Sequence, residues 1–346
     1  DHALLTEIKR QVPVDHRPFE LLGRKLDISE QECLRRLELL RQQGVIQHIG
    51  ASFNAEALGY DVTLAAMRVA AEHVDQAAAA AGEYPGTAFV CTRNDPFNVW
   101  VALAVPPEDT VDRVLGVLQT LAKSQETVRL PLARLYKRSD VPDPADTIPP
   151  IQGLEEPSEE LRRQKMRLRL SEEDLRFIRI LQEDLPLIEM PFAVLAEQAG
   201  ASEDALFAWI RQARHAGSVS RFAATVRPKT PQALGSILIA WQIPMEWVEQ
   251  VGEHMARVRE VSRCEQRAVH PSWPYSLLST IRVHTAADGM GVVGRIERQI
   301  GRFTHKHLFI LKEYQRVRPP LFSPALNEWW TQVGWPTLRG AQGSLT

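Results

Sequence analysis

The chain has few cysteines, no long apolar run and no excess of either charge. Only three cysteines, Cys33, Cys91 and Cys264, occur among 346 residues, and none belongs to a CxxC pair. This usage argues against a disulfide framework and against a structural zinc site, and it predicts a reducing, cytoplasmic location. A formal net charge of −2 provides no basic surface for nucleic acid and no polybasic membrane signal.

Membrane and cofactor motifs are missing as well. No segment approaches the roughly 18 consecutive apolar residues of a membrane-spanning helix, and the N-terminus has no apolar signal core. Because the chain starts at Asp1 rather than at methionine, we expect it to begin inside a longer gene product. No Gly-rich phosphate loop, metal-binding cluster or Ser–His–Asp spacing is present, so the sequence suggests no cofactor and no metal.

An internal duplication is the main positive feature of the sequence. The segment PFELLGRKLDISEQECLRRLELLRQQG at Pro18 matches PFAVLAEQAGASEDALFAWIRQARHAG at Pro191, at a constant offset of 173 residues. Cys91 and Cys264 keep this offset. The chain therefore consists of two similar halves.

The halves differ in length at one place. Pro96 stands five positions after Cys91, whereas Pro274 stands ten positions after Cys264. We therefore expect the second half to carry a five-residue insertion within this stretch. Loops grafted on a shared scaffold are where function usually resides.

Each half begins with a pattern that predicts three short helices. Ser29 and Ser202 are placed to cap the third helix, Gly44 and Gly217 to end it, and Glu32 to complete a capping box with Ser29. The alternating segments that follow each glycine predict a pair of strands of the winged type. The remainder of each half has the order βαββαβ, which is typical of a ferredoxin-like domain.

We therefore predict an α+β fold in which a winged helix-turn-helix plus a ferredoxin-like βαββαβ domain is duplicated and forms a pseudo-dimer. The predicted domains are a helix-turn-helix (1–60), a ferredoxin-like domain (61–140), a proline-rich linker (141–170), a second helix-turn-helix (171–230) and a second ferredoxin-like domain (231–330). The halves are expected to pair with each other, and a homodimer of the whole chain is left open.

This combination of domains resembles the leucine-responsive regulator family (Lrp/AsnC). That family binds DNA, and a ligand-responsive DNA-binding regulator is therefore one interpretation. The charge argues against it, because residues 1–60 carry a net charge of −1 and residues 171–230 a net charge of −2. We accordingly expect no nucleic-acid partner and no membrane partner.

Three short motifs are similar to siroheme decarboxylases: IGA after the third helix, FNVW in the first half, and WPYSL in the second. The fused layout resembles the form that serves haem d1 biosynthesis. The resemblance implies a cofactor-independent carboxy-lyase that converts siroheme to didecarboxysiroheme, with iron arriving in the substrate. A non-catalytic tetrapyrrole carrier is the third interpretation.

The chain also departs from that family's pattern. A His–Gly pair is expected after the WPY strand, where Arg282 and Val283 stand, with His284 next. In the first half, residues 95–97 (DPF) occupy the place of WPY. The two halves are therefore not expected to act identically.

Siroheme requires cations around a carboxylate rim, flat apolar walls, and a proton donor with a pKa near neutrality. His270 is the predicted proton donor, Arg267 a carboxylate anchor, and His48 a second acid. The predicted substrate-binding residues are Trp273, Tyr275, Arg282, His284, Arg221, Arg93, Asn94 and Trp100.

Plainer interpretations of these residues remain open. Trp273 and Tyr275 also suit core positions at the start of a strand. His270 also suits a solvated loop, in which case His48 or His284 donates the proton. Arg267 has Glu265 within reach as a partner at the surface.

Overall fold

The computed structural model describes residues 1–138, 170–226, 236–283 and 285–343. Apart from Leu170, the predicted linker lies outside these residues. The chain divides into two compact units, one of residues 1–58, 165–231 and 320–322, and the other of the remaining residues. Within the described parts, no helix is long and apolar enough to cross a bilayer.

The first unit contains the helix-turn-helix elements of both halves. The first half provides α1 (His2–Arg10), α2 (Pro18–Lys25), α3 (Glu30–Gln42) and β1 (Ile46–Phe53). The second half provides α7 (Glu172–Leu181), α8 (Pro191–Gln198), α9 (Glu203–His215) and β7 (Val219–Val226). β1 and β7 pair antiparallel, with Gly50 opposite Ala223. The winged pair predicted within each half is therefore wrong, because each half gives one strand to a shared two-stranded sheet.

The helix caps follow the sequence with one exception. The Ser29 hydroxyl accepts a hydrogen bond from the Glu32 amide at 3.2 Å, as predicted. The Glu32 carboxylate bonds to Arg35 instead of returning to the cap, so the predicted capping box is only half formed. A complete box stands at the start of α7, between Ser171 and Asp174.

The second unit contains both ferredoxin-like domains. The first half supplies β2 (Asp61–Arg68), α4 (Val74–Glu83), β3 (Thr87–Arg93), β4 (Val99–Val105), α5 (Val111–Leu121), β5 (Glu126–Leu130) and β6 (Leu132–Arg138). The second half supplies β8 (Ser236–Trp241), α10 (Met245–Arg257), β9 (Val261–Arg267), β10 (Leu277–Arg282), α11 (Ala286–Ile300), β11 (His305–Leu308) and β12 (Ile310–Arg316).

The two halves exchange their last strands. One sheet has the order β12-β3-β4-β2-β5 and the other β11-β8-β10-β9-β6, so β6 and β12 each complete the sheet of the opposite half. The segments predicted as single final strands break at Pro131, which has no amide to donate, and at Phe309. This exchange gives the predicted pseudo-dimer its physical basis.

The exchanged strands have matching registers. β6 places Leu132 opposite Arg267, and β12 places Ile310 opposite Arg93. Arg93 and Arg267 are therefore equivalent residues of the two halves.

The same registers correct one step of the sequence alignment. Leu135 lies opposite Glu265, and the corresponding Glu313 lies opposite Cys91. Cys91 is therefore equivalent to Glu265, and not to Cys264 as the offset of 173 predicted. An error of one residue in a strand exchanges its two faces.

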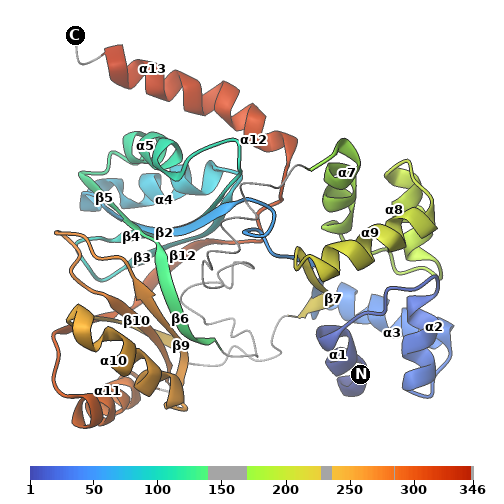
Figure 1. Cartoon of the computed structure of the whole chain (residues 1–346), viewed down its shortest axis with the longest axis horizontal. Helices are drawn as coiled ribbons and strands as arrows, with labels where there is room; N and C mark the ends of the chain where they lie inside the picture. Colours follow the sequence, from blue (N-terminus) through green and yellow to red (C-terminus); the bar gives the residue numbers. More distant parts are fainter. Residues whose placement is uncertain (139–169, 227–235, 284, 344–346) are drawn as a thin grey trace. The chain divides into compact units, whose positions relative to one another are not determined.

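Each sheet has its helices packed on one face, and the chain ends as a cover over the first half. α12 (Pro324–Trp329), a π-helical turn at 330–334 and α13 (Trp335–Gly343) follow the exchanged strand. Leu326, Trp329 and Trp330 belong to the same apolar core as residues of α4 and α5. Figure 1 shows α12 and α13 on the side of the sheet that carries α5. These late residues therefore stabilise the first half.

Candidate active site

The connection between β9 and β10 is the stretch in which the halves differ. His270 and Trp273 exchange two backbone hydrogen bonds, of 3.0 and 2.8 Å, which close a tight turn. The Ser272 amide donates to Nδ1 of His270 at 3.2 Å, and this bond holds the Nδ1 edge of the ring against the turn. His270 itself is exposed.

Hydrogen bonds at the end of this connection show which residues of the two halves are equivalent after the longer loop. The Ser276 hydroxyl bonds to both backbone groups of the residue two positions after β8. The Asn98 side chain makes the corresponding two bonds in the first half. Asp95 is therefore equivalent to Trp273, as the sequence predicted. Because Arg93 is equivalent to Arg267, the second half carries four extra residues between these positions, and not the five that the sequence predicted.

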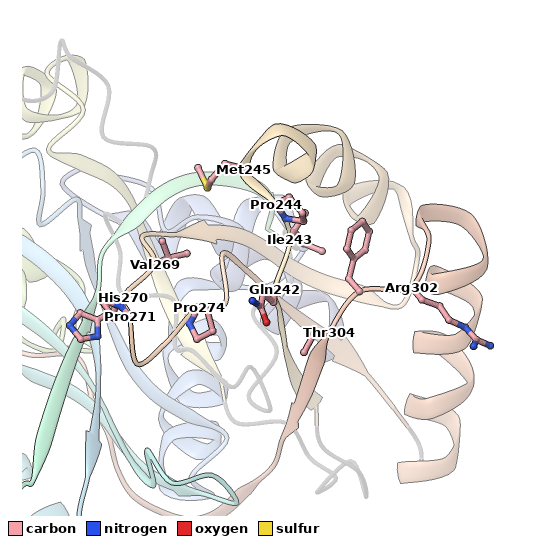
Figure 2. A pocket seen from close by; sticks show the side chains of 11 residues that line it. Gln242, Ile243, Pro244, Met245, Val269, His270, Pro271, Pro274, Arg302 and Thr304 are labelled. Atoms are coloured by element: carbon pink, nitrogen blue, oxygen red, sulfur yellow. The ribbon is translucent and has the colours of Figure 1, made fainter.

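His270 lines a cavity of about 700 Å³ within the second half. Three connections form its wall: 242–245 between β8 and α10, 269–274 between β9 and β10, and 302–304 between α11 and β11. Figure 2 shows His270 and Arg302 at opposite ends of the lining, with Gln242 and Pro274 between them. Most of the remaining wall is apolar: Ile243, Pro244, Met245, Val269, Pro271 and Phe303.

This arrangement suits a flat apolar ligand with anionic substituents. Ligand cavities commonly have volumes of about 300–1,000 Å³, with mostly apolar walls and a few polar groups. Arg302 carries a guanidinium, a group that pairs with carboxylates, and His270 an imidazole, a group suited to proton transfer; in Figure 2 both side chains extend outward from the ends of the lining. Among the described residues, no group of three or more His, Cys, Asp or Glu side chains is placed to bind a metal ion.

Arg302 is the cavity residue that the sequence reasoning missed. It follows Gly301, which ends α11 with a φ of 94°, and it precedes β11. A cation in a loop that leads back into a sheet was the available signal.

Trp273 is fully buried and does not line the cavity. Its ring makes edge contacts with Phe97 at 5.8 Å and Trp100 at 5.4 Å, both from the first half, and a tilted contact with Tyr275 at 4.9 Å. Tyr275 is 7% exposed. The interpretation of these two residues as core aromatics therefore fits their positions better than direct contact with a ligand.

Arg267 is committed to a buried charge network. Its guanidinium donates to Glu265 at 2.9 and 2.6 Å and to the carbonyl of Leu130 at 2.7 Å. Arg263 donates to the other Glu265 oxygen at 2.7 Å. The plainer interpretation named the right partner, but the pair is in the interior and not at the surface. This geometry does not offer Arg267 to a substrate carboxylate.

Burial and charge act in opposite directions on Glu265. Burial alone would raise the pKa of its carboxyl, but Arg263 and Arg267 outweigh that effect and hold the pKa below its usual range. The carboxylate is therefore ionised in the folded protein at neutral pH.

Three of the candidates from the first half have structural contacts. Arg93 is buried and donates to the carbonyl of Leu308 at 3.2 Å, and burial lowers the pKa of its guanidinium. The amide side chain of Asn94 bonds to the backbone around Phe309, between β11 and β12. Trp100 donates its indole N–H to the first half's own backbone at 2.8 Å.

Of the four remaining candidates, His48, Arg221 and Arg282 do not lie in the cavity lining. His48 belongs to the first unit, where Nε2 donates to the carbonyl of Gln182 at 2.9 Å. Arg221 is exposed on β7 of the same unit. Arg282 is exposed at the end of β10. His284 lies outside the described residues.

Family models match both parts of each half. A siroheme decarboxylase NirDL-like HTH domain model matches residues 1–46 and 174–219. A model of the AsnC-like ligand binding domain matches residues 57–137 and 234–315. The duplication inferred from the sequence is thereby confirmed.

Relatives and solved structures agree with these matches. The chain is 25% identical over 336 residues to a siroheme decarboxylase of Hydrogenobacter thermophilus, covering 95% of this chain and 97% of that protein. It is 31% identical over 137 residues to the siroheme decarboxylase alpha subunit of Desulfovibrio desulfuricans, covering 40% of this chain and 79% of that subunit. The crystal structure of the siroheme decarboxylase NirDL with an iron-uroporphyrin III analogue has a TM-score of 0.77 at 24% identity, covering 96% and 97% of the two chains.

Proposed function

The chain belongs to the siroheme decarboxylase family, and we propose that it removes two acetate carboxyl groups from siroheme to give didecarboxysiroheme in haem d1 biosynthesis. The observation that carries this proposal is similarity to the H. thermophilus siroheme decarboxylase over nearly the whole of both chains. Each acetate loses carbon dioxide by cleavage of the bond to its carboxyl carbon. The electron pair remains on the carbon attached to the pyrrole, which takes up one proton and becomes a methyl group.

We assign the reaction to the cavity of the second half. Its apolar wall suits the face of the macrocycle, and Arg302 suits one of the carboxylates at the rim. His270 is the proposed general acid, because an imidazole titrates near neutral pH and this one lies in the cavity wall.

No further cofactor enters the proposal. Decarboxylation at a pyrrole acetate needs a proton and an electron-accepting ring system, and the substrate supplies the ring together with its iron. The enzyme is accordingly proposed to be a cofactor-independent carboxy-lyase. Its three cysteines are buried thiols, which is compatible with work in the reducing cytoplasm.

The test is anaerobic incubation of the purified chain with siroheme, followed by chromatography and mass spectrometry. We expect a product lighter by two molecules of carbon dioxide. A mono-decarboxylated species that forms first and then disappears would support stepwise reaction. Tight binding of siroheme with no change in its mass would refute the enzyme and favour the carrier.

A further inference from the structure

His270, the proposed proton donor, lies in the connection between β9 and β10, which is anchored in the protein interior by a buried residue. His270 is exposed, but its backbone is joined by two hydrogen bonds to Trp273, which has no exposed surface. A movement of Trp273 therefore moves the backbone of His270 directly.

The surroundings of Trp273 come largely from the first half. Phe97 and Trp100 meet its ring edge-on at centroid distances of 5.8 and 5.4 Å. Aromatic contacts of this kind contribute about 0.5–1.5 kcal/mol each beyond the area they bury. The second half thus relies on its partner half to hold the residue that anchors its own loop.

A lysine also contacts Trp273 and links it to the first half. The Lys306 ammonium, on β11, lies 5.6 Å from the centre of the Trp273 ring and 5.2 Å from that of Tyr275. The same ammonium bonds at 2.6 Å to Asp95 of the first half. The other oxygen of Asp95 accepts the Phe97 amide at 3.0 Å. Asp95 therefore fixes both the cation above Trp273 and the aromatic ring beside it.

We propose that the first half positions the proton donor of the second: Asp95, Phe97 and Trp100 hold Trp273, and Trp273 holds His270 at the cavity wall. Asp95 and Trp273 are positioning residues, since neither lines the cavity. The effect on rate rests on the proposed function, whereas the effect on the loop does not. A displacement of about 1 Å in a catalytic group is enough to cost about 100-fold in rate.

The first variant is Asp95→Asn, which keeps the size of the side chain and removes its charge. We expect turnover to fall by about 10-fold while siroheme affinity changes by less than about 2-fold, because the cavity wall is intact. Asp75→Asn is the matched control, since Asp75 forms an ion pair of 2.7 Å with Lys312, whose ammonium lies 4.3 Å from the Tyr314 ring. This control is expected to retain the wild-type rate. An equal loss in affinity and turnover for Asp95→Asn would overturn the proposal.

A second variant separates positioning from general damage to the fold. Trp273→Phe keeps an aromatic anchor and is expected to retain more activity than Trp273→Ala. In a His270→Ala background, Trp273→Ala should cause little additional loss, because the loop then has no proton donor left to position. Full additivity of the two losses would contradict the proposal.

Hydrogen exchange gives a measurement that does not depend on turnover. The amides of His270 and Trp273 close the turn, so both should exchange faster in Asp95→Asn and Trp273→Ala than in the wild type. Unchanged exchange at both amides would overturn the positioning role even if the enzyme is a siroheme decarboxylase. Faster exchange in a chain that leaves siroheme intact would support the role and refute only the proposed function.

Discussion

Three equivalent positions in the two ferredoxin-like halves show how differently the same site in a fold can be filled. In the second half they hold a buried triad of Arg263, Glu265 and Arg267, while the first half has Phe89, Cys91 and Arg93 there. The last arginine of each set does the same job, donating to the carbonyl of the leucine that ends an edge strand of the opposite half, Leu130 or Leu308.

The comparison separates what the scaffold requires from what one half has added. The arginine that bridges the exchanged strands is common to both halves and belongs to the scaffold. The carboxylate and the second arginine are found at these positions only in the half that also carries the longer loop and the cavity. A buried ion pair is weak evidence for stability, because desolvation offsets much of its attraction. Substitution of Glu265 tests how much these ion pairs contribute to stability.

The largest effect is expected at the loop that the first half lacks. His270→Ala should lower turnover by about 100- to 10,000-fold, the usual value of a positioned general acid. Siroheme binding should change little, because the proposed binding contacts are those of Arg302 and the apolar wall. His254, a histidine on α10 bonded to Gln299, provides the control variant His254→Ala. The measurement is the single-turnover rate of the wild type and of each histidine variant. Near wild-type rates for His270→Ala together with a large loss for His48→Ala would place the acid in the other unit.

The next effect concerns the stability of the buried triad. Glu265→Ala removes the carboxylate that pairs with two buried guanidinium groups. The loss should cost about 3–5 kcal/mol in the free energy of unfolding. The counterpart Cys91→Ala removes one sulfur atom and should cost about 1 kcal/mol. Arg267→Ala should likewise act on stability first, and not on siroheme affinity as the sequence had predicted. Chemical denaturation of the three variants is the measurement, and equal losses for Glu265→Ala and Cys91→Ala would contradict this account.

A transplant between the halves should have a smaller effect. The double variant Arg263→Phe with Glu265→Cys gives the second half the residues of the first. The variant removes Arg263 and Glu265 together, and replacing a buried ion pair by apolar residues is often neutral or stabilising. Arg267 keeps its bond to the Leu130 carbonyl but loses the Glu265 carboxylate, so the loss in unfolding free energy should be about 2 kcal/mol, smaller than for Glu265→Ala. A loss as large as that of Glu265→Ala would mean that the second half needs its charges for a reason that the first half does not share.

The sequence predicted the architecture because repetition and capping are local signals. The helix-turn-helix pattern and the caps at Ser29 and Ser202 can be read from short windows of sequence, and the duplication and the βαββαβ order follow from comparing such windows along the chain. The exchange of β6 and β12 was not predictable in this way. Alternation of apolar residues identifies a strand but does not say which half supplies its neighbour.

The candidate site was predictable only in part, for a related reason. The position of the longer loop follows from counting residues between the repeats, and His270 does line the cavity there. The burial of Arg267 and Trp273 depends on partners more than 130 residues away, namely Leu130 and Trp100. No local pattern indicates such contacts, and the one-residue error at Cys91 and Cys264 hid the equivalence of the two arginines.

A modest pH effect should distinguish His307 from its counterpart Arg129 in the first half. Burial, followed by the neighbouring charge of His305, lowers the pKa of His307. The folded protein then binds this proton less readily than the unfolded chain, whose histidine pKa is about 6.5. Stability should therefore fall as the pH drops below about 6.5, and His307→Gln should remove that part of the fall. Denaturation at pH 7.5 and 5.5 measures it, and identical pH dependence in both proteins would rule His307 out as the source.

The smallest effect, essentially none, is expected when DNA is added to the two helix-turn-helix elements. Both regions carry net negative charge, and Arg35 and Arg36 on α3 are held by Glu32 at 2.8 and 2.6 Å. On α9, Phe207 packs against the unit's aromatic core, and Trp209 donates to a carboxylate at 2.6 Å. Side chains used in this way are not available to neutralise phosphates or to read base edges. A gel-shift titration at low salt is the measurement. A salt-sensitive and sequence-selective shift at sub-micromolar protein would show that the helix-turn-helix elements bind DNA.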